Sequence, residues 1–178
     1  MYIEKIISNK THYYKKVDFY VPVTIEFPDN NDRYGLADVL YYRYLDQDSS
    51  LLEVTINSKS MQIVRVALVS INKTVEQANA DNTHSKVEVI EGNPLINMGV
   101  FSESNIVTEN REIKFKYLNK KIWIILSETV DYGVVMGDLT ILLNNNNEIS
   151  GFTVEGFSTK EWEIIQAGCW DRKSTRLN

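Results

Sequence analysis

The stretch ILLNNNNEISGFTVEGFSTKEW, residues 141–162, decides the fold, because its four consecutive asparagines either separate two domains or form a turn inside one. The flanking runs VVMGDLTILL (134–143) and ISGFTVEGF (149–157) are rich in Val, Ile, Leu and Phe, as β-strands are. Asparagine tolerates left-handed backbone geometry and suits a short reversal. The sequence therefore predicts a hairpin turn here and no domain boundary.

A helix is predicted directly after this hairpin, in STKEWEIIQAG (158–168). Ser158 and Glu161 have the spacing of a capping box, in which each residue's side chain binds the other's backbone N–H. Gly168 stands where a C-cap glycine belongs. We expect Trp162 on this helix, like Trp123 upstream, to anchor the core.

The rest of the chain reads as strands. Alternating apolar residues in DFYVPVTIEF (18–27) predict a strand, and Pro22 favours an edge position because proline cannot donate to a ladder. Apolar residues on both faces of MQIVRVALVSI (61–71) predict a central strand. Further strands are predicted in DVLYYRYL (38–45) and LLEVTI (51–56), which flank the loop DQDSS, and in EIKFKYL (112–118) and KKIWIILSE (120–128).

The most polar stretch, residues 72–98, is predicted to be a long connection between two β-rich halves, residues 1–71 and 99–170, within one compact domain. When residues 45–60 are laid over residues 143–158, the polar turns and apolar positions coincide. Two interpretations stay open: an internal duplication, or the likeness that any two β-hairpins share. The fold class is thus α+β, predominantly antiparallel β in hairpins or a meander, with a short C-terminal helix and a possible two-fold repeat.

The final residues, DRKSTRLN (171–178), resemble a translated reading frame of a sequencing-library adapter, so we expect a non-native tail. A frameshift or a genuine basic tail is the alternative. Without this segment the net charge of −5 becomes more negative, which argues against nucleic-acid binding because that affinity comes from Lys and Arg. For the mixed stretch YYRYL (41–45), which could stack on bases, cross-strand packing is therefore the preferred interpretation.

Composition and motifs exclude several classes. At 43% hydrophobic and 24% charged residues the chain is typical of a globular domain. It contains no apolar run long enough to span a membrane, no secretory signal and a single cysteine, so we expect a cytoplasmic protein. The two histidines lack zinc-ligand spacing, and DQDSS lacks the glycine and glutamate of a calcium loop. We expect no metal, no cofactor and no catalytic residue.

The segments TIEFPDNNDRYG (24–35), VEVIEGNPLIN (87–97) and GFTVEGFSTKEW (151–162) resemble uncharacterised cytoplasmic proteins of low-GC Gram-positive bacteria, over most of residues 17–168. Some of these are similar to immunity proteins encoded beside polymorphic toxins. The resemblance implies a non-enzymatic binding protein with a cognate toxin as partner.

Acidic faces suit a basic toxin, and we expect the contacts to include four aspartates of the first half: Asp29, Asp32, Asp46 and Asp48. The alternatives are an enzyme with carboxylates in a cleft between the halves, or a structural β module that oligomerises through a strand edge.

Overall fold

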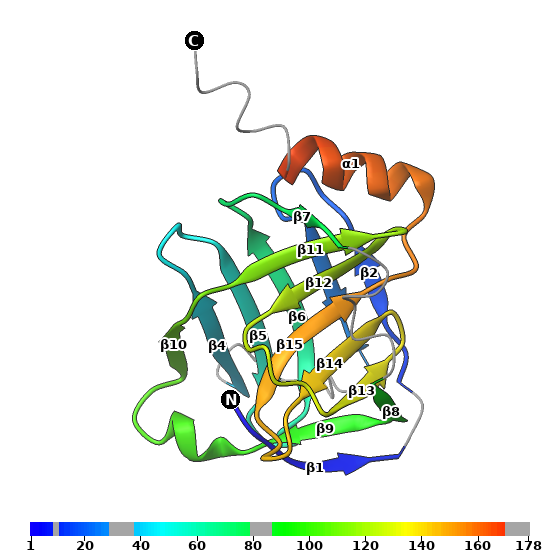
Figure 1. The fold of residues 1–178 in the computed structure, drawn as a ribbon. Coiled ribbons are helices and arrows are strands. Elements are labelled where there is room, and N and C mark those ends of the chain that lie inside the picture. Colours follow the sequence, from blue (N-terminus) through cyan, green and yellow to red (C-terminus); the bar gives the residue numbers. More distant parts are fainter. Residues whose placement is uncertain (9–10, 29–37, 79–86, 170–178) are drawn as a thin grey trace.

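The computed structural model describes residues 1–8, 11–28, 38–78 and 87–169, and shows two large β-sheets packed face to face (Figure 1). The six-stranded sheet has the order β10 (Ile106–Asn110), β4 (Val39–Leu45), β5 (Leu51–Asn57), β6 (Ile63–Ser70), β3 (Val23–Glu26) and β2 (Tyr14–Lys16). The seven-stranded sheet has the order β7 (Glu76–Gln77), β11 (Lys114–Leu118), β12 (Lys121–Ile125), β15 (Ile149–Val154), β14 (Leu139–Leu143), β13 (Tyr132–Met136) and β8 (Glu88–Glu91).

Most neighbouring strands are antiparallel, which confirms the fold class predicted from the sequence. Three edge strands pair in parallel instead: β10 with β4, β7 with β11, and β8 with β13. A short 3-10 helix (Met98–Phe101) precedes β10, and the helix α1 (Thr159–Cys169) follows β15. In Figure 1, α1 lies at one end of the sandwich and the small sheet of β1 (Ile3–Ile7) and β9 (Asn93–Ile96) at the other.

The core lies between the two sheets. Each strand turns alternate side chains inward, and the inward positions hold almost only aliphatic and aromatic residues. At the centre of the interface, side chains of both sheets line one small apolar space: Val23, Ile25, Leu52, Val66, Leu68, Ile122, Ile124 and Val154. One continuous hydrophobic cluster therefore belongs to both sheets.

The small sheet ties the two large sheets together at its end of the sandwich. Ile3 N–H donates to Asn147 O (2.9 Å) in the turn between β14 and β15. On the other side, Ile96 N–H donates to Met61 O (2.8 Å) in the turn before β6. The β1–β9 pair thus joins a turn of each large sheet through backbone hydrogen bonds.

Three expectations need correction. β3 is not an edge strand, because β2 pairs outside it and Pro22 lies before its first residue. Residues 72–98 are not only a connection, since β7, β8 and β9 form within them. The helix runs past Gly168 to Cys169; the glycine instead allows close approach of Phe19, whose carbonyl oxygen would lie 3.1 Å from an added Cβ.

The loop DQDSS forms the turn of the β4–β5 hairpin, as predicted. Asp46 Oδ1 accepts hydrogen bonds from the backbone N–H groups of Asp48 (2.9 Å) and Ser50 (3.0 Å). Ser49 N–H donates to Asp46 O, and Ser49 adopts a left-handed conformation with φ of 62°. This is a three-residue hairpin loop in which the third residue is left-handed.

The asparagine run forms the same turn between β14 and β15. Asn144 Oδ1 accepts from the N–H groups of Asn146 (3.0 Å) and Glu148 (3.1 Å), and Asn147 has φ of 61°. The run is therefore a hairpin turn and not a linker. The correspondence between the two halves ends with the hairpin, because β6 follows the first and α1 follows the second.

These matched turns allow a direct comparison of left-handed residues. Ser49→Gly should stabilise the fold by about 1 kcal/mol, because a non-glycine residue pays a steric cost in this conformation. Asn147→Gly should stabilise the fold by less, since asparagine tolerates the same φ better than serine does. Urea unfolding of both variants measures the difference; an equal gain at the two sites would contradict this explanation.

The predicted capping box is present at the start of α1. Ser158 N–H donates to Glu161 Oε2 (2.8 Å), and Glu161 N–H donates to Ser158 Oγ (3.3 Å). Burial alone would raise the pKa of Glu161, but its hydrogen bonds with Ser158 outweigh this and lower it. Trp162 packs beside Phe157, with ring centroids 5.7 Å apart, and is partly buried against the core.

Ser158→Ala should destabilise the protein by about 1 kcal/mol at neutral pH. Because the folded-state pKa of Glu161 is lowered, its contribution is present above the unfolded-state pKa and is lost as the pH falls through the folded-state pKa. The cost of Glu161→Ala, which removes the carboxylate that accepts from the Ser158 backbone N–H, should therefore shrink in acid. Urea unfolding at neutral and acidic pH tests this, and a pH-independent cost would count against the capping role of Glu161.

Candidate functional site

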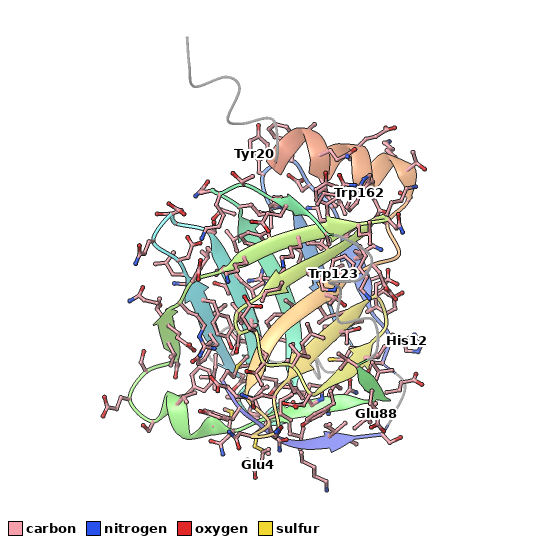
Figure 2. The ribbon with its side chains drawn as sticks, in the orientation of Figure 1. Glu4, His12, Tyr20, Glu88, Trp123 and Trp162 are labelled. Atoms are coloured by element: carbon pink, nitrogen blue, oxygen red, sulfur yellow. The ribbon has the colours of Figure 1, made fainter. Side chains whose placement is uncertain are left out.

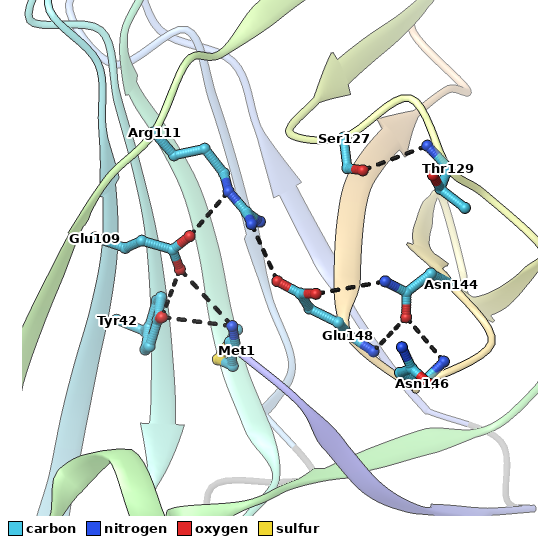
Figure 3. Close-up of polar contacts among 9 residues, drawn as sticks. All are labelled: Met1, Tyr42, Glu109, Arg111, Ser127, Thr129, Asn144, Asn146 and Glu148. Carbon is cyan, nitrogen blue, oxygen red and sulfur yellow. Dashed lines mark hydrogen bonds and ion pairs between the residues drawn. The ribbon is translucent and has the colours of Figure 1, made fainter.

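A polar cluster lies where the chain passes from β10 of the six-stranded sheet to β11 of the seven-stranded sheet (Figure 3). Arg111, just after β10, places Nε 2.9 Å from Glu109 Oε1 and Nη2 3.0 Å from Glu148 Oε1. Glu109 belongs to β10, whereas Glu148 closes the asparagine turn before β15. The guanidinium therefore bridges carboxylates of both sheets.

Two tyrosines of β4 extend this cluster inward. Tyr42 donates its hydroxyl hydrogen to Glu109 Oε2 (2.6 Å), and its ring lies 5.1 Å from that of Tyr44. Burial and the bond to Glu109 raise the pKa of Tyr42, and burial also raises the pKa of Tyr44 well above its usual value. Both phenols therefore stay protonated, so Tyr42 serves as a hydrogen-bond donor and not as a base.

The amino group of Met1 also borders the cluster, 3.8 Å from Glu109 Oε2, and burial lowers its pKa although Glu109 and Glu148 oppose this. Burial alone would lower the pKa of Arg111, but the negative charges of Glu109 and Glu148 outweigh this effect, so the pKa is raised. Within the described chain, Arg111 Nη1 and the hydroxyl of Tyr44 are buried without a hydrogen-bond partner. This geometry is that of a clamp between sheets and leaves neither carboxylate free for acid–base chemistry.

Arg111→Met should destabilise the protein by roughly 2–3 kcal/mol, because two partly buried carboxylates lose their charged donor. The matched control is Lys59→Met, which removes an ion pair with Asp38 whose lysine is 73% exposed. That control should cost less than about 1 kcal/mol. Denaturant unfolding compares the two variants, and equal costs would show that Arg111 is not a clamp.

A second clamp joins the sheets near the turn between β13 and β14. The Lys15 side chain, 8% exposed, extends from β2 and places Nζ 2.5 Å from Asp138 Oδ2 and 2.6 Å from the carbonyl oxygen of Gly156. Beside it, the ring of Tyr13 lies where a Cβ at Gly137 would stand, only 2.2 Å from the nearest ring carbon. Gly137 also has φ of 63°, so both the turn and the packing require glycine.

An open groove of about 510 Å³ lies beside this clamp, with Trp123, Phe157, Lys121, Asp138 and Glu155 among its lining residues. Trp123 is buried, as predicted, but on the face of its sheet opposite the core, because β12 turns Ile122 and Ile124 inward. Lys121 Nζ lies 5.5 Å from the centroid of the indole ring and 2.9 Å from Glu155 Oε2. The aromatic surface is thus already occupied by a paired lysine.

Two of the four aspartates proposed as contacts, Asp46 and Asp48, are described and lie in one turn. Lys73 Nζ lies 2.6 Å from Asp46 Oδ2 and 3.5 Å from Asp48 Oδ2. Burial alone would lower the pKa of Lys73, but Asp46 and Asp48 outweigh it and raise it. The Asp46 side chain is 1% exposed and that of Asp48 60%, so only Asp48 presents its carboxylate to solvent. Asp29 and Asp32 lie outside the described residues.

The structure exposes a different acidic segment that the sequence reading passed over. All four residues of β8 are exposed, and Glu88 and Glu91 flank Val89 (58% exposed) and Ile90 (43% exposed). Figure 2 labels Glu88 at the side of the seven-stranded sheet. The alternation in VEVIE (87–91) was the available signal, but it is short and stands inside the polar stretch 72–98.

No protein-family model matches the sequence, and no curated protein matches it either. Within the described ranges, no three or more His, Cys, Asp or Glu side chains are grouped so that they could hold a metal ion. Among the described residues, no helix has the length and apolar character required to cross a membrane.

Proposed function

We propose that this chain is a non-enzymatic binding protein that neutralises a basic protein toxin in the cytoplasm, as an immunity protein does. The observation that supports it best is the sign of the described surface, where exposed acidic residues outnumber exposed basic ones. The exposed acids are Glu4, Glu26, Asp48, Glu76, Glu88, Glu91, Glu103, Glu112, Glu128, Asp131, Glu155 and Glu163. The exposed bases are Lys5, Lys16, Lys59, Lys114 and Lys160.

A surface of one dominant sign attracts a partner of the opposite sign and orients it during encounter. The interior carboxylates serve another purpose, because Glu109 and Glu148 bind Arg111, and Asp46 binds Lys73. The carboxylate-cleft alternative would need an acid with a free oxygen in a cavity. The exposed acids therefore favour recognition of a basic protein over catalysis.

Co-expression provides the test. The chain should restore growth of cells that produce the cytotoxic domain encoded beside its gene, and the purified pair should associate. Raising the salt from about 0.05 to about 0.3 M should weaken the association at least several-fold, because exposed charges are screened. A chain that folds normally yet gives no protection, or an association that is insensitive to salt, would refute the proposal.

A further inference from the structure

The strand β8 forms one edge of the seven-stranded sheet. It pairs in parallel with β13 on one side, in the register Glu88–Tyr132 to Glu91–Val135. On its other side no described strand pairs with it. An edge strand offers unpaired backbone N–H and C=O groups to any extended chain that comes alongside.

The other edges of the two large sheets differ from β8. β2 and β7 contain only three and two residues, and such short edges offer few hydrogen bonds. β10 is longer, but its alternate residues Val107 and Glu109 are partly covered. β8 alone among these four edges has at least four residues with every side chain exposed.

Along β8 two apolar residues stand between two acidic ones, and each face of the strand carries one apolar and one acidic side chain. Val89 lies over Gly133, since an added Cβ on that glycine would stand 3.4 Å from Val89 Cγ1. Ile90 is opposite Val134, which is fully buried, yet Ile90 itself remains 43% exposed. β-Branched residues on an open strand edge match a further strand, whose own side chains would cover them.

A second copy of the chain is a poor occupant of this edge. Two-fold antiparallel pairing of two β8 strands centred on Val89 would set Glu88 of each copy opposite Ile90 of the other. Neither acidic residue of β8 would then face a cation, and opposite-charge pairs are the ones that stabilise neighbouring strands. The complementary strand instead carries basic residues opposite these two acidic residues, with apolar residues between them.

We infer that β8 is a docking edge that accepts an extended, basic strand of a partner protein, with Lys or Arg opposite Glu88 and Glu91 and apolar residues opposite Val89 and Ile90. This inference rests on the proposed function and deepens it, because it names the strand that meets the partner. Backbone hydrogen bonds supply the attachment, and the paired charges supply the selectivity.

A pair of synthetic peptides tests the docking edge without knowledge of the partner. The probe is acetyl-Ser-Thr-Lys-Val-Val-Lys-Thr-Ser-amide, and its control has Glu in place of both Lys. The lysine peptide should shift the amide NMR signals of residues 88–91 and bind about tenfold more tightly than the glutamate peptide. N-methylation of both valines should abolish binding, because it removes backbone donors.

Charge-reversal variants then distinguish an effect of the acidic residues of β8 from an effect of the net charge of the protein. Glu88→Lys/Glu91→Lys should reverse the preference between the two peptides. Glu26→Lys/Glu163→Lys, with the same charge change at two other exposed acids, should keep it. Any one of four results would overturn the inference. The two peptides bind equally well, or neither binds at millimolar concentration. Alternatively, the NMR shifts lie away from residues 88–91, or the chain forms a dimer that Glu88→Lys/Glu91→Lys dissociates.

The outcomes for β8 and for the proposed function remain distinguishable. If the chain protects cells and Glu88→Lys/Glu91→Lys protects equally well, the docking edge is wrong while the function stands. If the unaltered chain gives no protection, the function fails, and the peptide measurements still decide whether β8 accepts a basic strand.

Discussion

The burial of one apolar face of each large sheet against the other is the constraint on which the rest of the structure depends. Neither sheet can cover its inner face alone, and apolar area removed from water contributes about 25 cal/mol per Å². The chain must therefore cross from one sheet to the other, and among the described residues it does so first between β6 and β7 and again between β10 and β11. Ile113 in this second crossing is fully buried, so the connection itself contributes to the core.

Polar contacts then fix how the two sheets meet. Arg111 and Lys15 both reach from the side of the six-stranded sheet to a turn of the seven-stranded sheet, and both stand at the margin of the core. Charges in the centre would cost more in desolvation than pairing returns. At the margin of the core each cation pairs with a carboxylate. The two clamps therefore fix the orientation of one sheet relative to the other, which hydrophobic burial alone does not determine.

Local signals in the sequence predicted the local structure well. The asparagine turn, the DQDSS turn and the Ser158–Glu161 capping box depend only on neighbouring residues, and all are present. Strand position was harder, because β2 is three residues long and shows no clear alternation, so β3 was mistaken for an edge. The parallel partners of β7, β8 and β10 are set by tertiary pairing, which no window of sequence reveals.

In the candidate site, too, contacts within a turn could be predicted from the sequence, and contacts between distant segments could not. That Asp46 would cap its own turn follows from its place in DQDSS, since aspartate commonly accepts from the backbone two residues on. Its ion pair with Lys73 depends on packing between distant segments and could not be foreseen. The proposed contact Asp46 is therefore engaged within the fold, while the exposed pair Glu88 and Glu91 became visible only once β8 was placed at an edge.

The turns of the two hairpins share a geometry that depends only on residues within each turn. Asp46 and Asn144 differ in charge, yet each accepts the same two backbone hydrogen bonds and each turn has a left-handed third loop residue. Beyond the turns the arrangements diverge, since β5 pairs with the following strand β6 and β15 with the preceding strand β12. The shared geometry follows from the side-chain acceptor and the φ that this loop requires, whatever the ancestry of the halves. The order of strands, by contrast, depends on which apolar faces must be buried. The two halves differ in this respect, because different strands lie beside their hairpins.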